Sequence, residues 1–330
     1  MRGIVLGAVL ALSCVITPAL ADSCPGNPQA LGVSREMVVS AAEYSRLGRM
    51  QYRQTLPLAD REVVLTFDDG PLLPYSDRVL DILASHCVKA TFFLVGRHAR
   101  AYPAAVRRIY NAGHTIGTHS QNHPLRTITN ARVEIDGGIE SVVAALGDAK
   151  ALAPFFRVPG LLRTPQLEAE AKSRDLIVWS SDTLADDWKK ISSQQVLQLA
   201  LSRLESKGRG VMLLHDIQPR TVLMLPQLLT ELKARGFKIV HVVPEGERPV
   251  LVGPTIVAST GGEGWPRVLA ATAPRATTGQ SAGDAAAEAA GNAIALGDDV
   301  PLPRARPARR MADKPKPPTV LAMRSLHAPE

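Results

Sequence analysis

The sequence contains few cysteines, which limits the metal sites that it can build. Three cysteines occur in 330 residues, and they do not form the paired clusters that hold structural zinc. The sequence also has no glycine-rich phosphate loop of the dinucleotide-binding or P-loop kind. Aromatic residues make up only 4% of the chain, but the hydrophobic fraction of 45% is ample for a globular core. We therefore expect a globular protein that has neither a cysteine-rich structural zinc site nor a glycine-rich phosphate-binding loop.

An apolar segment at the N-terminus is too short for a comfortable membrane span. Residues 4–16 follow a positively charged residue and precede a small-residue cleavage site, which is the pattern of a secretory signal peptide. We therefore expect residues 1–21 to be removed and the protein to be exported to the periplasm or secreted. Export implies an oxidising compartment, and the mature chain keeps Cys24 and Cys87, so a single disulfide between them is expected.

The net charge of +7 is unevenly distributed along the chain. The last thirty residues contain seven Lys and Arg residues against two Asp and Glu residues, and much of residues 249–330 is rich in Ala, Gly, Ser, Thr and Pro. Such a segment buries too little apolar surface to offset the entropy lost on ordering. We expect a low-complexity, disordered tail that associates with an anionic cell envelope, and no nucleic-acid partner.

Between the two ends, short apolar strands alternate with amphipathic helices. Strands are predicted over residues 62–69, 90–95, 114–118, 154–158, 176–181, 211–215 and 238–243, and helices over residues 78–87, 103–112, 131–146, 165–174, 193–206 and 223–235. This alternation is typical of parallel strands with helices outside, in either a (β/α) barrel or an open doubly wound sheet. We assign this α/β domain to residues 61–248 and treat residues 22–60 as an N-terminal arm.

Polar residues that follow the strands favour the barrel. They occur at the ends of five of the predicted strands, and they are Asp68, Asp69, His119, Arg157, Asp182, His215 and Asp216. In a barrel these ends converge on one face, where such enzymes build their sites, whereas an open sheet would spread them along an edge. We therefore predict a distorted (β/α) barrel with about seven parallel strands, because an eighth strand is not visible.

Two carboxylates and two histidines suggest a metal site. Asp68 and Asp69 end a buried strand, where a charge is costly unless a metal, proton or partner compensates it. The alternative is a turn with an Asp cap. His119 and His123 are four residues apart, so both can face one metal, although such a pair can also be ordinary surface or core histidines. Two His and one Asp that leave an open position have the composition of a catalytic zinc site.

Three further residues are candidates for chemistry around this site. His215, at the end of a strand, is placed to act as a general acid, or it makes only a local hydrogen bond. Arg157 is placed to hold a base carboxylate, or it is a solvated salt-bridge arginine. Trp188 is placed to wall a sugar-binding cleft, or it packs in the core. A glycosidase is the rival for paired carboxylates, but adjacent Asp residues do not flank a bond and the histidines would be idle.

These residues occur in an order that resembles a known family. The resemblance is to the polysaccharide deacetylases, the carbohydrate esterase group four enzymes with a NodB homology domain. It covers about residues 62–243. The motifs are Thr66-Phe67-Asp68-Asp69-Gly70, His119-Ser120-x-x-His123, Arg157-Val158-Pro159-Gly160, Asp187-Trp188 and Leu213-Leu214-His215.

The resemblance implies a role for most of the candidate residues. It implies that Asp69, His119 and His123 hold a divalent metal, with Zn²⁺ preferred over Co²⁺ or Mn²⁺. It implies that Asp68 is the catalytic base and His215 the catalytic acid.

The resemblance also implies two supporting roles and leaves one ambiguity. Arg157 would tether the base, and the backbone N–H of Gly160 would help to bind the oxyanion. The fourth motif is stretched, so that Asp186 and Asp187 compete to support His215. The third motif lacks the aromatic residue that commonly follows its proline, which puts the shape of the substrate cleft in doubt.

The activity implied by the resemblance is the removal of N-acetyl groups from acetylated amino sugars. The expected substrate is a poly- or oligosaccharide that contains N-acetylglucosamine, and acetate is released. Peptidoglycan, chitin-like oligomers and an exported polymer all fit, and nothing in the sequence chooses among them. The alternative is a non-catalytic protein that binds cell-wall glycan through its cleft and basic tail, against which the complete set of five motifs argues.

Overall fold

The computed structural model describes residues 24–125, 128 and 130–251. The predicted signal peptide and residues 252–330 of the predicted tail lie outside the described residues. Among the described helices, none combines the length and the hydropathy that a membrane crossing requires.

All seven predicted strands are present, and every strand pair in the described sheet is parallel. The strands are β3 (Glu62–Asp68), β4 (Thr91–Leu94), β5 (Thr115–Thr118), β6 (Phe155–Arg157), β7 (Ile177–Trp179), β9 (Gly210–His215) and β10 (Lys238–Pro244). Strand β3 pairs with β9 over residues 63–68 and with β4 over residues 66–68. From β4 the sheet continues through β5 and β6 to β7.

Three further strands were not predicted, and two of them correct the prediction of an N-terminal arm. They are β1 (Arg35–Val39), β2 (Arg46–Leu47) and β8 (Thr183–Leu184). Strand β1 pairs with β10, and β2 pairs with β7. Residues 24–60 therefore belong to the domain. The sequence signal is weak because β2 has two residues and β1 exposes three of its five.

The sheet is a distorted barrel, as predicted. Strand β8 pairs with β9, but no pair in the described part of the chain joins β7 to β8. One buried cluster takes side chains from five or more strands of the sheet, and it includes Val64, Phe93, Phe155, Trp179 and Val211. The rings of Phe93 and Phe155 lie 5.7 and 5.0 Å from that of Trp179. This cluster fills the interior, so the barrel is a packed core.

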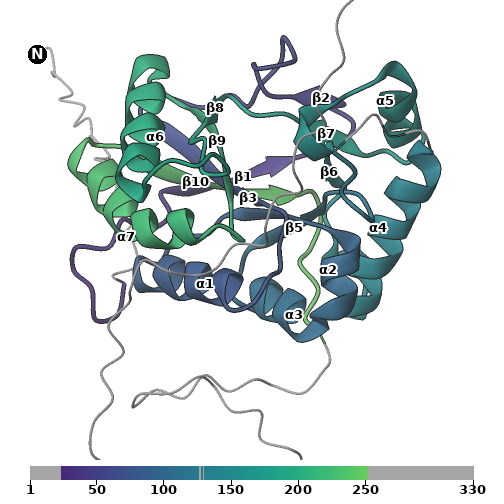
Figure 1. The fold of residues 1–330 in the computed structure, drawn as a ribbon, viewed down its shortest axis with the longest axis horizontal. Helices are drawn as coiled ribbons and strands as arrows, with labels where there is room; N and C mark the ends of the chain where they lie inside the picture. Colours follow the sequence, from purple (N-terminus) through teal and green to yellow (C-terminus); the bar gives the residue numbers. More distant parts are fainter. Residues whose placement is uncertain (1–23, 126–127, 129, 252–330) are drawn as a thin grey trace, which may run out of the picture. The chain divides into compact units, whose positions relative to one another are not determined.

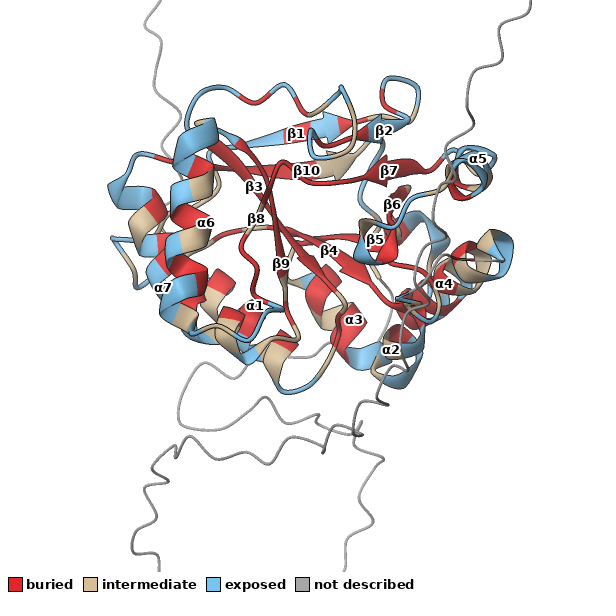
Figure 2. Cartoon of the chain, turned by 45° about the horizontal axis from the view of Figure 1, so that its top comes forward, coloured by how far each residue is buried: buried red, intermediate tan, exposed pale blue. Residues whose placement is uncertain are grey.

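Helices surround the sheet on most sides, and the N-terminal strands cover the remaining side (Figure 1). The helices are α1 (Tyr75–Ser85), α2 (Gly96–Ala101), α3 (Pro103–Asn111), α4 (Ala131–Leu146), α5 (Pro165–Lys172), α6 (Ser193–Lys207) and α7 (Pro219–Ala234). Figure 2 shows that they turn buried faces to the sheet and exposed faces outward. Helix α2 was not predicted, because its six residues are too few to give a helical period. Single 3₁₀ turns occur at η1 (Ala149–Ala151) and η2 (Pro159–Leu161).

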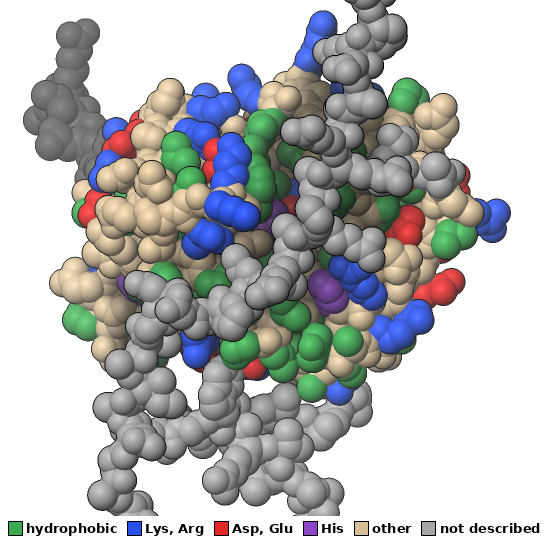
Figure 3. All heavy atoms as spheres, in the orientation of Figure 1, with side chains coloured by type: hydrophobic (Ala, Val, Ile, Leu, Met, Phe, Trp, Pro, Cys, Tyr) green, Lys and Arg blue, Asp and Glu red, His purple; other side chains and the backbone are tan. Residues whose placement is uncertain are grey.

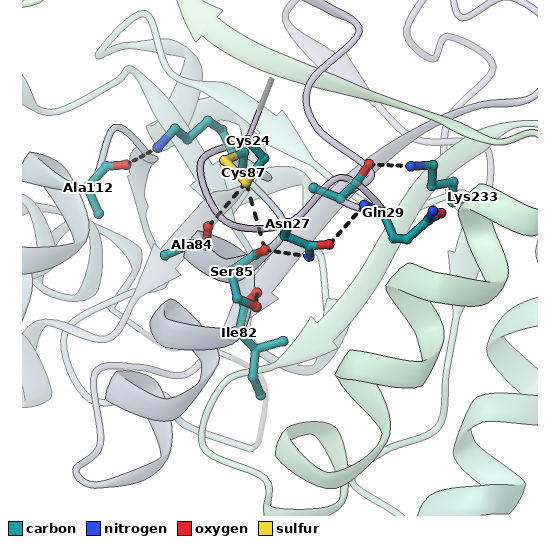
Figure 4. Close-up of a disulfide and its surroundings, with 11 residues drawn as sticks. Cys24, Asn27, Gln29, Ile82, Ala84, Ser85, Cys87, Ala112 and Lys233 are labelled. Atoms are coloured by element: carbon teal, nitrogen blue, oxygen red, sulfur yellow. Dashed lines mark hydrogen bonds between the residues drawn. A yellow bond between two sulfur atoms is a disulfide. The ribbon is translucent and has the colours of Figure 1, made fainter. Parts of the chain in front are cut away.

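A disulfide joins the N-terminal segment to the residues after α1 (Figure 4). It links Cys24 to Cys87 across a sequence separation of 63 residues. Beside it, Asn27 Nδ2 donates a hydrogen bond of 2.8 Å to the carbonyl oxygen of Ser85. In the chain-entropy model a loop of this length contributes about 4 kcal/mol of stability by restricting the unfolded chain. The bond therefore fastens the segment that leads into β1.

Candidate active site

Two carboxylates from the end of β3 point to the same place. Asp68 is the last residue of the strand and is buried. Asp69 has a left-handed backbone with φ of 77°, so the alternation of successive strand side chains is broken there. As a result, Asp68 Oδ2 lies 3.8 Å and Asp69 Oδ1 lies 3.4 Å from His119 Nε2.

Gly70, which follows the two carboxylates, is required by close packing. A Cβ atom at this position would lie 2.1 Å from Oδ2 of Asp216, a distance that no side chain tolerates. Asp216 is fully buried, and burial raises the pKa of its carboxyl group to about 7. The glycine of the first motif therefore allows the residue after His215 to pack beneath the turn.

The two histidines lie in a turn after β5, not on a helix. Ser120 and His123 both have left-handed backbones, with φ of 64° and 51°. This turn brings His123 Nε2 to 3.1 Å from Asp69 Oδ1. The Nδ1–H of His119 donates to the carbonyl oxygen of Arg157 at 2.7 Å, so its Nε2 is free to be a ligand.

These three side chains fit a divalent metal. One ligand atom each from Asp69, His119 and His123 lies within 4.8 Å of the other two. Asp69 Oδ1 is buried and has no hydrogen-bond partner among the described residues, which is costly without a compensating cation. Burial raises the pKa of Asp69, but the neighbouring imidazoles lower it by more, so the carboxylate is ionised. Two nitrogens and one oxygen suit zinc, and also cobalt or manganese.

Arg157 is fully buried and holds Asp68, which rules out a solvated arginine. Its Nη1 donates to Asp68 Oδ1 at 2.7 Å and to Thr66 Oγ1 at 2.8 Å, and its Nη2 donates to the carbonyl oxygen of Ser180. The guanidinium also lies 4.1 Å from the ring centroid of Phe93. One oxygen of Asp68 is thus fixed and the other faces the histidines.

His215, at the end of β9, is oriented by Asp187 and not by Asp186. Its Nδ1 lies 2.7 Å from Asp187 Oδ1, and its backbone N–H donates to Asp187 Oδ2, which also accepts from Thr221 Oγ1. Asp186 instead pairs with Lys189 and Arg203.

The surroundings of His215 raise its pKa. Burial by itself lowers the pKa, but the hydrogen bond and charge of Asp187, with the charges of Asp69 and Asp68, raise it by more. The result is a pKa of about 9. The imidazolium is therefore the dominant form at neutral pH, with its Nε2 4.0 Å from Asp69 Oδ2.

A cavity of about 520 Å³ opens over these residues. Its polar floor contains Asp68, Asp69, His119, His123 and His215. Its walls include Gly160 of η2 and the ring of Trp188, which is 42% exposed and lies 5.5 Å from the ring of His215. Trp188 is thus a cleft wall and not part of the core. Apart from the disulfide, seven predicted site residues line the cavity, and the other two, Arg157 and Asp187, are fully buried and bind Asp68 and His215.

The structure adds residues that the sequence analysis did not single out. Arg97 and His98 of α2 line the cavity, as do Leu125 and Leu161. The rule that polar residues follow strand ends would have found the first two, because they come directly after the predicted strand at residues 90–95. Asp182, which that rule did find, lies elsewhere, where its carboxylate accepts from the N–H groups of Arg49 and Val211 and from Thr55.

Comparison with known proteins connects this site to a group of enzymes. The family model described as "Polysaccharide deacetylase" matches residues 56–178. The chain is 35% identical over 204 residues to a peptidoglycan-N-acetylglucosamine deacetylase of Bacillus cereus, covering 60% of this chain and 72% of that protein. It is 29% identical over 203 residues to a chitooligosaccharide deacetylase of Rhizobium leguminosarum bv. trifolii, covering 54% of this chain and 89% of that protein.

Solved structures give the same picture. A peptidoglycan deacetylase of Bdellovibrio bacteriovorus matches with a TM-score of 0.59 and 32% identity, over 66% of this chain and 61% of that chain. A peptidoglycan N-acetylglucosamine deacetylase in complex with 4-naphthalen-1-yl-N-oxidanyl-benzamide matches with a TM-score of 0.52 and 29% identity, over 62% of this chain and 92% of that chain. The family model covers Asp68, Asp69, His119, His123 and Arg157, and it ends before Asp187, Trp188 and His215.

Proposed function

Because the chain belongs to the polysaccharide deacetylase family, we propose that it is a metal-dependent hydrolase that removes N-acetyl groups from glycans containing N-acetylglucosamine. One observation carries the proposal: the possible metal ligands Asp69, His119 and His123 share a cavity with a tethered carboxylate, Asp68, and an oriented imidazole, His215. The named relatives act on peptidoglycan or chitooligosaccharides, so both are candidate substrates.

The proposed mechanism divides proton transfer between two residues. A divalent metal, when bound, lowers the pKa of water and polarises the amide carbonyl group. Asp68, held through one oxygen by Arg157, accepts a proton from the attacking water with its other oxygen. His215 donates a proton to the amine nitrogen as the amide C–N bond breaks. Acetate and a free amino sugar result.

Two cavity residues are proposed to bind the substrate. The backbone N–H of Gly160 would donate to the oxyanion, a contribution that is typically worth about 10²–10³-fold in rate when one such donor is removed. Trp188 would pack against the sugar, since an exposed aromatic face beside a catalytic group is a common wall for a pyranose. The ring also borders the ring of His215.

Export of the protein is part of the proposal. The N-terminal residues have the pattern of a signal peptide, and the Cys24–Cys87 disulfide suits an oxidising compartment. A periplasmic or secreted enzyme would meet cell-wall glycans. We also propose that the basic C-terminal residues associate with the anionic envelope. In addition, the face of the described domain that Figure 3 shows carries many Lys and Arg side chains.

Removal of metal is expected to stop acetate release. The measurement is acetate released from N-acetylglucosamine oligomers, peptidoglycan and an acetylated polymer, before and after dialysis against a chelator. Activity should return when Zn²⁺ is added, and Co²⁺ and Mn²⁺ serve as comparisons. An undiminished rate in chelated, metal-free protein would contradict the proposal. Glycan binding without acetate release, whatever metal is present, would favour the non-catalytic alternative.

Replacement of Asp187 is expected to shift the pH profile. Asp187→Asn removes the charge that raises the pKa of His215, so the imidazolium loses its proton at a lower pH than about 9. A general acid must be protonated, and therefore the alkaline limb of kcat/KM should move to lower pH. Asp186→Asn is the matched control, because that carboxylate pairs with Lys189 and Arg203 instead. Equal shifts in both variants would argue against the role given to Asp187.

A further inference from the structure

The turn that carries His119 and His123 is held by the start of α2. The backbone N–H of Gly96 donates to the carbonyl oxygen of Ser120 at 2.9 Å, and that of Arg97 donates to Gln121 at 2.9 Å. The Arg97 side chain continues the series, because its Nη1 donates to the carbonyl oxygen of Asn122 at 2.9 Å. Three successive carbonyl groups between the two histidines are thus bound by two residues.

The next residue of α2 holds the other ligand segment. His98 Nδ1 lies 2.7 Å from the carbonyl oxygen of Asp69. A carbonyl oxygen only accepts, so Nδ1 carries the hydrogen in this contact. His98 Nε2 is then the acceptor for the Nε–H of Arg97, at 3.3 Å. A continuous chain of hydrogen bonds therefore runs from Asn122 through Arg97 and His98 to the backbone of Asp69.

This contact acts on a backbone in an unfavourable conformation. The left-handed region is strained for a non-glycine residue, and Asp69 adopts that region with φ of 77°. A hydrogen bond to the Asp69 carbonyl group offsets part of that strain. It also keeps the carboxylate on the side where the histidines lie.

We propose that Arg97 and His98 are positioning residues of the metal site. Arg97 joins the histidine turn to His98, and His98 fixes the backbone of Asp69, so that all three ligands are preorganised. The inference rests on the proposed metal-dependent function. It deepens that function, because neither residue belongs to the five motifs.

Neither Glu134 nor an ion pair of Arg97 accounts for this connection between the histidine turn and Asp69. Glu134 of α4 accepts from the backbone N–H groups of Gln121 and Asn122, at 3.1 and 2.8 Å, but it touches only the turn. Arg97 is exposed, yet no carboxylate of the described residues forms an ion pair with it. Its side chain instead contacts the turn that carries His119 and His123, and it contacts His98, which binds the backbone of Asp69. An ordinary surface arginine has no such set of partners.

The test measures zinc affinity of metal-free protein by competition with a chromophoric chelator. Arg97→Ala and His98→Ala are expected to weaken zinc binding about 10–100-fold, the usual effect of removing an outer-shell partner. His98→Asn should restore most of the affinity, because the Asn amide nitrogen replaces Nδ1 as donor to Asp69. His98→Gln places its amide nitrogen nearer the position of Nε2 and should not.

The controls separate positioning from folding and from substrate contact. Arg78→Ala, an exposed arginine of α1 for which the structure shows no ion pair or side-chain hydrogen bond, should bind zinc like the original protein. The Tm of metal-free Arg78→Ala should be unchanged. His98→Ala loses a contact that offsets strain at Asp69 and should have a lower Tm, so zinc binding is measured well below the Tm of every variant. For Arg97→Ala, the zinc concentration that gives half-maximal acetate release should rise by the same factor as the zinc Kd, since the loss lies in metal binding.

Three results would overturn the inference alone, and a fourth would also overturn the proposed function. Unchanged zinc affinity in His98→Ala would show that His98 does not preorganise Asp69. Equal weakening in His98→Asn and His98→Ala would point to packing of the ring and not to its Nδ1–H. A raised KM with normal zinc affinity in Arg97→Ala would make Arg97 a substrate contact. Failure of the unsubstituted protein to bind zinc, cobalt or manganese would overturn the proposed function together with this inference.

Discussion

Asp69→Asn is expected to lose bound metal and acetate release together. Asp69 is the only carboxylate in the group of three possible ligands, and the change removes the negative charge that balances the cation. Two neutral imidazoles then remain, which is too few to hold zinc in competition with water. The loss of rate should equal or exceed the 10²–10⁴-fold or so that proton transfer alone contributes.

The measurement is zinc per chain beside acetate release, with Asp68→Asn as the matched control. The two variants make the same chemical change at adjacent positions, so any difference reports position and not charge. The left-handed backbone also tolerates Asn well, which keeps the fold of Asp69→Asn intact. Full zinc and a near-normal rate in this variant would refute the assignment of Asp69 as a ligand.

Asp68→Asn is expected to keep the metal and lose about 10²–10⁴-fold in kcat. Asn cannot accept the proton of water, but its carbonyl oxygen can still accept from Arg157. His215→Ala should give the same combination, metal retained and turnover lost, because it removes the proposed acid. The measurement is kcat of the unsubstituted protein, Asp68→Asn and His215→Ala at one saturating zinc concentration.

The Tm of these variants must be measured beside their rates. Arg157 is fully buried, and Asp68 supplies its counter-charge at 2.7 Å. Breaking a buried ion pair destabilises a protein by about 3–5 kcal/mol, and the hydrogen bond that Asn retains should reduce this loss. A lowered Tm is therefore expected for Asp68→Asn, and the assay temperature should be well below that Tm. Loss of zinc in Asp68→Asn with zinc retained in Asp69→Asn would reverse the two roles.

Much of the fold was predictable because its signals are local. Each of the seven predicted strands is a short apolar run, and six of them are followed by a predicted helix. The structure contains all seven strands. Parallel pairing then brings the carboxyl ends together, so polar residues that follow strands were enough to nominate Asp68, Asp69, His119 and His215. Strands β1 and β2 were missed because their stability comes from pairing with β10 and β7, which are far away in the sequence.

Other features of the site are decided only in three dimensions. The sequence places Asp186 and Asp187 side by side, and the choice between them depends on which one faces β9 and which one faces Lys189 and Arg203. Nothing in the residue types says that Asp69 turns left-handed, since that conformation is unfavourable by itself and depends on contacts from α2. The sequence by itself determined seven of the ten described strands, the barrel and the identity of the reactive groups, because these follow from hydrophobic period and residue type. The tertiary structure alone decided where those groups point, because long-range hydrogen bonds to His98, Arg157 and Asp187 set their orientation.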